Sequence, residues 1–131
     1  MKKKQIKVFI SFDYEHDKDI RNSLQQQMDN QESLRFIDCS IHKPIDEKWK
    51  REARKKIENC DLVIFLCGRN TSTTSGVTAE MSIVQELKKP YILLKGRKRI
   101  KVEKPKNSLK SDMIIPWKWK RIVGEINKIF C

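Results

Sequence analysis

The chain has 131 residues, 38% of them apolar and 35% charged, which is the length of one domain and the composition of a globular rather than a disordered protein. No apolar run approaches the roughly 20 residues of a membrane span, and too few apolar residues follow the basic start for a signal peptide. We therefore expect a single domain over residues 1–131, located in the cytoplasm. The net charge of +12 is scattered over at least three segments, and the basic run 95–110 contains no aromatic residue, which does not favour a nucleic-acid groove.

The first half of the chain alternates apolar runs with helical periods. Residues 6–12 are β-branched, aromatic and almost continuously apolar, as in a buried parallel strand. Asp17 and Asp46 stand where helix N-caps are expected. The predicted elements are a strand at 6–12, a helix at 18–28, a strand at 34–40 and a helix at 47–60. The buried stripes of the two helices are predicted to be Ile20, Leu24 and Met28, and Trp49, Ala53, Ile57 and Cys60.

The second half repeats this alternation around the strongest strand signal of the chain, residues 61–68, whose length and apolar content suit the centre of a sheet. A Ser/Thr-rich turn at 68–76 follows, and then a helix. Later elements are a strand at 91–96 after Pro90, a loop at 97–110, a short edge strand at 113–116 and a helix at 117–130. The apolar side of that last helix is predicted to hold Trp119, Ile122, Val123, Ile126 and Phe130.

Strands that alternate with helices through short connections predict an α/β domain with a parallel sheet. We expect a flavodoxin-like three-layer sandwich with strand order 2-1-3-4-5. Ligands bind such sheets beyond the carboxyl ends of the strands, where the winding direction reverses. This point lies between the first and third strands, so the predicted site is formed by the loops at 11–17 and 68–76.

The helix that begins near Val77 carries an unexpected carboxylate. Its apolar stripe includes Val77, Ile83, Val84 and Leu87, and Glu80 falls on that same face at helical spacing. A capping-box glutamate would need Ser or Thr three residues earlier, where this chain has Val77. Glu80 either faces a functional crevice or gains a few tenths of a kcal/mol from the helix dipole. The pattern alone leaves both interpretations open.

Other polar residues near the predicted site have simpler interpretations. The hydroxyls of residues 71–75 and the amides at the helix start would suit a phosphate, although the segment is neither a Walker A loop nor GxGxxG. Turn and cap roles are favoured for Asp13 and Asp17, and exposed loop positions for His16 and His42. Three of the four cysteines lie in or beside apolar runs and are expected to be reduced core thiols. The cysteines form no CxxC pair and no histidine stands at ligand spacing from them, so no metal site is expected.

Three segments in order resemble a TIR domain: VFISFDYEHD, ARKKIENCDLVIFLCGRNT and GVTAEMSI. The chain is most similar to the compact TIR-like family that includes the signalling subunit of the bacterial Thoeris anti-phage system. The likeness runs from Lys7 to Gly96 and continues more loosely to the end. It implies a flavodoxin-like fold, and enzymatic members of the family cleave the nicotinamide–ribose bond of NAD, which is a substrate rather than a cofactor.

The resemblance also implies roles for individual residues. Glu80 corresponds to the catalytic glutamate, and Ser11, Phe12 and Asp13 would line the NAD pocket. Residues 41–46 correspond to the loop that gates the pocket and mediates assembly. Beside the substrate we also expect Thr74, Ser75 and Gly76. At position 76 many NAD-cleaving relatives carry tryptophan, so this chain departs from the pattern there.

Three hypotheses follow. The first is an enzyme that cleaves NAD into nicotinamide and an ADP-ribose-derived signal, acts as a homo-oligomer and has its product sensed by a downstream effector. The second is a non-catalytic adaptor that works by self-association. The third is a basic nucleic-acid or nucleotide sensor, for which binding should weaken steeply with salt.

Overall fold

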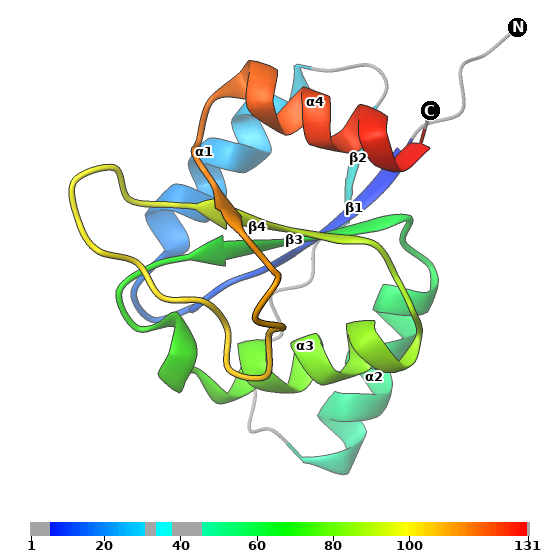
Figure 1. The fold of residues 1–131 in the computed structure, drawn as a ribbon. Coiled ribbons are helices and arrows are strands. Elements are labelled where there is room, and N and C mark those ends of the chain that lie inside the picture. Colours follow the sequence, from blue (N-terminus) through cyan, green and yellow to red (C-terminus); the bar gives the residue numbers. More distant parts are fainter. Residues whose placement is uncertain (1–5, 31–33, 38–45, 131) are drawn as a thin grey trace, which may run out of the picture.

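The protein is an α/β sandwich whose central sheet is entirely parallel (Figure 1). The structure, a computed structural model, describes residues 6–30, 34–37 and 46–130. The strands are β1 (Ile6–Ser11), β2 (Leu34–Ile37), β3 (Leu62–Cys67), β4 (Tyr91–Lys95) and β5 (Ile114–Ile115). The helices are α1 (Lys18–Asp29), α2 (Glu47–Glu58), the short 3-10 helix η1 (Thr71–Thr73), α3 (Ser75–Glu86) and α4 (Trp119–Phe130).

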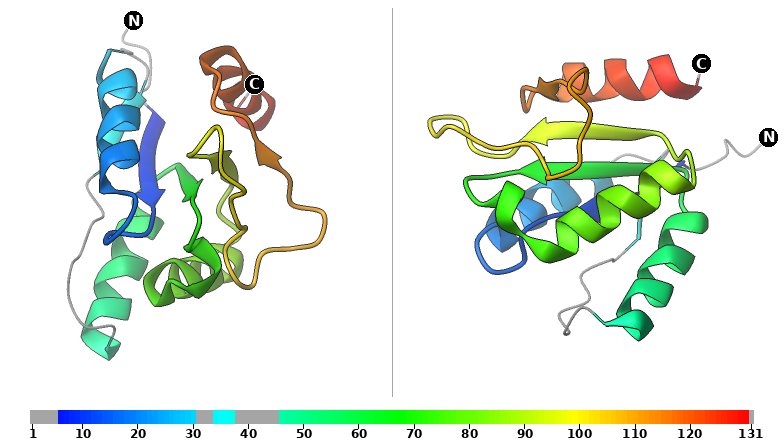
Figure 2. Two further views of the ribbon diagram at one scale, coloured as in Figure 1. Left: turned by 90° about the vertical axis from the view of Figure 1, so that its left-hand side faces the viewer. Right: turned by 60° about the horizontal axis from the view of Figure 1, so that its bottom comes forward.

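The sheet has the order β2-β1-β3-β4-β5, so the predicted order 2-1-3-4-5 is confirmed. Helices α1 and α4 cover one face of the sheet and α2 and α3 the other, which gives the three expected layers (Figures 1 and 2). The winding reverses between β1 and β3, which pair directly from Val8 opposite Leu62 to Ser11 opposite Phe65. The carboxyl ends of these two strands therefore adjoin, as the predicted site requires.

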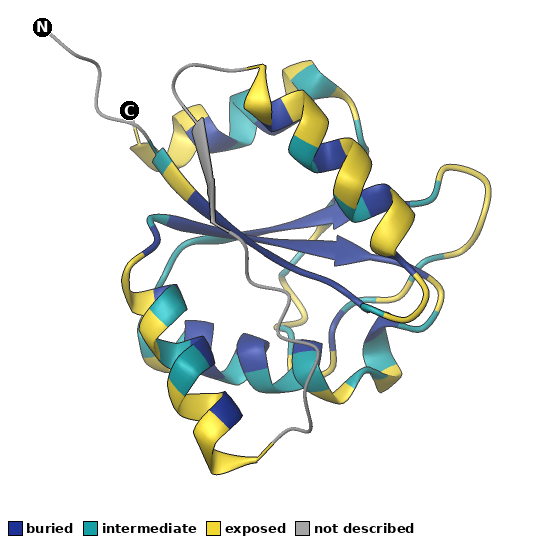
Figure 3. Ribbon diagram, turned by 180° about the vertical axis from the view of Figure 1, so that it is seen from behind, coloured by how far each residue is buried: buried dark blue, intermediate teal, exposed yellow. Residues whose placement is uncertain are grey.

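The core lies on both sides of β3, whose six residues are all buried (Figure 3). Helices α1 and α2 contribute the predicted stripes, including Leu24 and Ile57, which are fully buried. Cys60 and Cys67 are free buried thiols, and burial raises their pKa values to about 11 and about 12, so the prediction of reduced core cysteines is confirmed for these two. Cys39 and Cys131 lie outside the described residues.

The helices follow the predictions, except that α2 ends at Glu58 rather than at residue 60, α4 begins at Trp119 rather than at residue 117, and three further points differ. Asp46 caps α2 by accepting a hydrogen bond from the Trp49 amide at 2.8 Å, as predicted. Asp17 occupies the N-cap position of α1 but makes no cap hydrogen bond, since its carboxylate is used elsewhere. Helix α3 begins two residues earlier than expected, because the Thr74 carbonyl already accepts the Thr78 amide at 3.1 Å. Phe130 is exposed in the last turn of α4.

Other expectations for this half of the chain agree with the structure. Residues 97–110 form no strand or helix, and the short edge strand is present as β5. None of the helices in the described ranges is long and apolar enough to cross a membrane. The end of the second predicted strand at 38–40, His42 and most of the predicted gating loop 41–46 lie outside the described residues.

The residue directly after the C-cap of α3 has a left-handed backbone conformation, although it is not glycine. Lys88 has φ of 53°, and the amides of Lys88 and Lys89 donate back to Gln85 and Val84, the pattern that usually places glycine at this position. We expect Lys88→Gly to raise the free energy of unfolding by about 0.5–1 kcal/mol, because glycine adopts this conformation without the steric cost of a Cβ. Urea unfolding at pH 7 measures this. Lys88→Ala is the matched control and should give no gain, since it removes the side chain but keeps the Cβ.

Candidate functional site

Glu80 projects from α3 toward the sheet and is only 6% exposed. It is the sixth residue of the helix, and it shares the inward face with the buried residues Val77 and Val84. Ser11, at the end of β1, donates a hydrogen bond from its hydroxyl to the Glu80 Oε1 atom at 2.8 Å. Since the dipole effect falls off within the first helical turn, it does not explain this buried carboxyl in the second turn.

Burial raises the pKa of Glu80 to about 8, because removal from water disfavours the charged form. The Ser11 hydrogen bond and the positive charge of Lys56 act in the opposite direction and limit the shift. The carboxyl group is therefore mainly protonated at neutral pH in this state of the protein. A perturbed carboxyl at the carboxyl end of a parallel sheet is a candidate for acid–base or electrostatic catalysis.

The two residues that follow Ser11 in the chain have contacts other than Glu80. Phe12 is buried, with its ring centroid 6.1 Å from that of Tyr14. Asp13 is also buried and accepts the Glu15 amide at 3.1 Å, which confirms the predicted turn role. Of the three residues predicted to line a pocket, the structure joins only Ser11 to Glu80 directly, and the substrate roles of Phe12 and Asp13 stay predictions.

His16 is 55% exposed at its side chain, as expected of a loop histidine, but it is not free. Its Nδ1 atom lies 2.7 Å from the Oδ2 atom of Asp13. This hydrogen bond to a carboxylate is the main reason why the pKa of His16 is raised above its usual value. A spacing of three residues in a turn gives no recognisable sequence signal, so the pair was not predicted.

Most hydroxyl groups of the Ser/Thr-rich segment form hydrogen bonds within the protein. Thr71 is buried and accepts the Gly68 amide at 2.7 Å, and the hydroxyl of Ser72 donates to Glu103. Thr73 and Thr74 both donate to the carbonyl of Asn70, at 3.0 and 2.9 Å. These contacts shape the turn before α3, so the predicted phosphate role is not needed to explain the hydroxyls.

Residues 74–76 stand at the start of α3, one to two turns before Glu80. Thr74 is the N-cap residue, and Ser75 and Gly76 lie in the first turn, Ser75 exposed and Gly76 half-buried. Among the hydrogen bonds of the described residues, none joins these three to Glu80. Their role beside a substrate stays a prediction.

An ion pair between buried Asp17 and half-buried Arg97 lies at the same carboxyl end of the sheet, and the sequence did not predict it. Asp17 is 2% exposed, and its Oδ1 atom lies 3.2 Å from Arg97, which also binds Asp19 at 2.8 Å. Its Oδ2 atom lies against Gly68, where a Cβ would stand only 2.2 Å away. Burial raises the pKa of Asp17, while Arg97 opposes the shift. The pair joins residues 80 positions apart, a separation that local patterns do not reveal.

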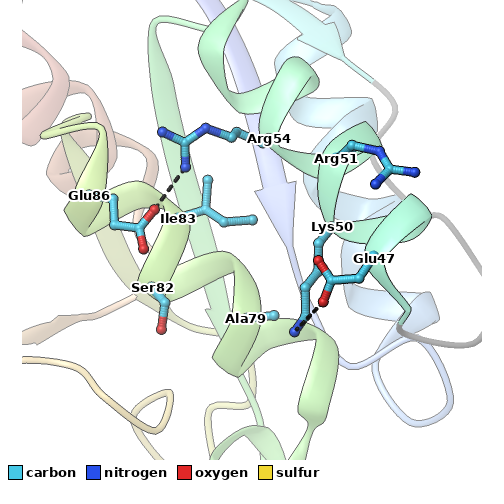
Figure 4. A pocket seen from close by; sticks show the side chains of 8 residues that line it. All are labelled: Glu47, Lys50, Arg51, Arg54, Ala79, Ser82, Ile83 and Glu86. Carbon is cyan, nitrogen blue, oxygen red and sulfur yellow. Dashed lines mark hydrogen bonds and ion pairs between the residues drawn. The ribbon is translucent and has the colours of Figure 1, made fainter.

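A surface pocket of about 370 Å³ lies between α2 and α3 (Figure 4). Arg54 reaches across it to Glu86, with 2.8 Å between Nη1 and Oε2, and Lys50 lies 3.8 Å from Glu47. Its apolar lining comes from Ala79 and Ile83. The lining residues are Glu47, Lys50, Arg51, Arg54, Ala79, Ser82, Ile83 and Glu86. Neither Ser11 nor Glu80 belongs to this set, so the pocket is separate from the predicted substrate site.

Comparison with known proteins agrees with the fold. The family described as "Thoeris protein ThsB, TIR-like domain" matches residues 9–101, most of the chain and all of the segment from the end of β1 through α3 and β4. A solved structure described as a prokaryotic SEFIR domain superposes with a TM-score of 0.58 over 95% of this chain and 89% of that chain. Its sequence identity is 16%, so it supports the fold alone. No curated protein matches the chain. The chain belongs to the ThsB TIR-like domain family of Thoeris proteins.

Proposed function

We propose that the protein cleaves the bond between nicotinamide and ribose in NAD and releases an ADP-ribose-derived signal in anti-phage defence. The observation that carries this proposal is the buried Glu80 carboxyl, hydrogen-bonded to Ser11 where the winding of the sheet reverses. Membership of the ThsB family and the position of Glu80 early in α3 support the same function.

One carboxylate is sufficient for this chemistry. Ordinary glycoside hydrolysis needs a second carboxyl group to protonate the leaving oxygen. The nicotinamide ring of NAD already carries a positive charge and leaves as a neutral molecule, so no acid is required. The remaining task is to hold the ribose hydroxyls and to stabilise the positive charge that develops at the anomeric carbon, which a carboxylate does best away from water.

Glu80 has to be ionised for this role. Because its pKa is about 8 in the unliganded protein, the value of kcat/KM should rise as the pH increases toward 8 and then level off. The Ser11 hydroxyl favours the ionised form, so Ser11→Ala should move this rise to higher pH. A bound nicotinamide cation acts in the same direction as Ser11 and helps to ionise the carboxyl in the complex.

Release of nicotinamide from NAD tests the proposal. Purified protein is incubated with NAD, alone and with lysate from phage-infected cells, and the products are identified by mass spectrometry. Glu80→Gln should reduce nicotinamide release by about 100-fold or more, because the amide cannot stabilise the developing charge. Glu86→Gln, on the exposed side of the same helix, is the matched control and should retain activity.

Equal activity of wild type and Glu80→Gln would contradict the proposal, whether both are active or both are inactive under every activating condition. Defence that survives Glu80→Gln would favour the adaptor hypothesis. From its TIR-like family we also infer that the protein acts as a homo-oligomer. A downstream effector would then sense the product that it releases.

A further inference from the structure

The turn after β1 contains a pair of side chains that the proposed cleavage step does not use. Asp13 is 4% exposed, and its two carboxylate oxygens have separate partners. Oδ1 accepts the Glu15 amide, and Oδ2 lies 2.7 Å from Nδ1 of His16. The carboxylate therefore fixes the imidazole by one nitrogen. With a proton on Nδ1, the second nitrogen, Nε2, is left as the acceptor of the neutral ring.

Two further hydrogen bonds fix the turn that contains Asp13 and His16. The Asp17 amide donates to the Asp13 carbonyl at 2.9 Å, and Arg97 donates to the His16 carbonyl at 2.9 Å. The charges of Asp13, Glu15 and Asp17 all raise the pKa of the imidazole, with Asp13 as the largest cause. A base oriented by a buried carboxylate and held in a fixed turn is the arrangement by which enzymes prepare a histidine to accept a proton.

The Asp13–His16 pair lies at the same strand end as the contact between Ser11 and Glu80. Asp13 is two residues beyond Ser11, so at most about 7 Å of chain separates the hydroxyl-bearing residue that contacts Glu80 from the carboxylate that contacts His16. The Glu80 carboxyl and the His16 imidazole are therefore both held by residues of one strand end, at the point where the winding of the sheet reverses.

We propose that His16, oriented by Asp13, is the general base that activates the acceptor of the ADP-ribosyl group, a water molecule or a hydroxyl compound. This inference rests on the proposed function. The acceptor oxygen forms a bond to the anomeric carbon as the bond to the nicotinamide nitrogen breaks. The electron pair of the broken bond goes to the ring, which leaves as neutral nicotinamide, and the acceptor proton passes to Nε2 of His16 and then to solvent.

Azide rescue tests this role, because azide is an anionic nucleophile that needs no deprotonation. His16→Gln should reduce nicotinamide release with water or hydroxyl acceptors by about 100-fold. Added azide should restore the rate to within about 10-fold of wild type and yield ADP-ribosyl azide. Azide should not restore Glu80→Gln, which lacks charge stabilisation. Lys18→Gln, an exposed change at the first residue of α1 directly after this turn, is the control and should behave as wild type with and without azide.

Two results would overturn the proposal: unchanged activity of His16→Gln, or a loss of activity that azide leaves uncorrected although the variant is folded by circular dichroism. A second measurement does not depend on turnover. On titration with ADP-ribose, the imidazole resonances of His16 should shift and saturate in NMR spectra. ADP-ribose that binds without moving them, or that does not bind, would also overturn it. A wild type that releases no nicotinamide refutes the proposed function, and the NMR titration then decides the contact by itself.

Discussion

Replacement of Glu80 by glutamine is expected to stabilise the protein at pH 8 by about 2–4 kcal/mol. The carboxyl is buried with Ser11 as its hydrogen-bond partner, and its pKa is raised to about 8 from 4.5. Ionising it inside the fold is costly, whereas it ionises freely in the unfolded chain. Glutamine keeps the size and accepts the Ser11 hydrogen bond without a charge. Active sites commonly contain residues that lower the stability of the fold, which agrees with the role proposed for Glu80.

The pH dependence of this gain follows from the sign of the pKa shift. Between pH 4.5 and 8 the folded protein holds a proton on Glu80 that the unfolded chain has lost. The contribution of Glu80 to stability is therefore complete below pH 4.5 and falls by up to about 1.4 kcal/mol per pH unit until pH 8. Glu80→Gln removes this trend, so its advantage should be near zero at pH 4.5 and largest at pH 8 and above.

Urea unfolding of both proteins at several pH values measures the difference. Glu86→Gln is the control, because its carboxylate is exposed in the same helix and its loss should produce no comparable trend. A stability difference between wild type and Glu80→Gln that does not change from pH 5 to pH 8 would show that Glu80 is ionised in the folded protein throughout this range.

Replacement of Gly68 by alanine is expected to cost about 3 kcal/mol. The new Cβ would lie 2.2 Å from Oδ2 and 2.7 Å from Cγ of Asp17, closer than atoms approach one another. Asp17 is buried and tied to Arg97, so its carboxylate is not free to move aside. The strain would pass into the turn that carries His16 and into the loop after β3, where the Gly68 carbonyl also accepts the Glu103 amide at 2.9 Å.

A double-mutant cycle distinguishes this clash from a general effect of losing glycine. In an Asp17→Ala background the added methyl group of Gly68→Ala should cost less than about 1 kcal/mol, because the atoms that it meets are gone. Gly124→Ala is a second control. Apart from the glycine itself, its chain neighbours and the backbone of its own helix, no heavy atom of the described residues lies within 4 Å of the new Cβ in α4, and the change should stabilise the helix by about 0.5–1 kcal/mol. Equal costs of Gly68→Ala in both backgrounds would refute the contact with Asp17.

The sequence by itself determined the layer architecture and the strand order. The periodicity of apolar residues and the residue types of turns and caps are local properties of the sequence. They are therefore enough to recognise the apolar run of β3, the four-residue spacing in α1 and the Asp46 cap of α2. The same patterns placed Glu80 on the inward face of its helix. The boundary of α3 was less accurate, because the Thr74 carbonyl can start a helix through two residues of low propensity, Ser75 and Gly76.

Only the tertiary structure decided which partners these side chains have. The hydrogen bond from Ser11 to Glu80 spans 69 residues, and the pair of Arg97 with Asp17 spans 80. Such contacts depend on how β1, β3 and β4 are aligned in the sheet. The burial that raises the pKa of Glu80 likewise comes from all the layers together. Local spacing predicts which face a residue occupies, but its charge state and its neighbours are set by segments that meet only after folding.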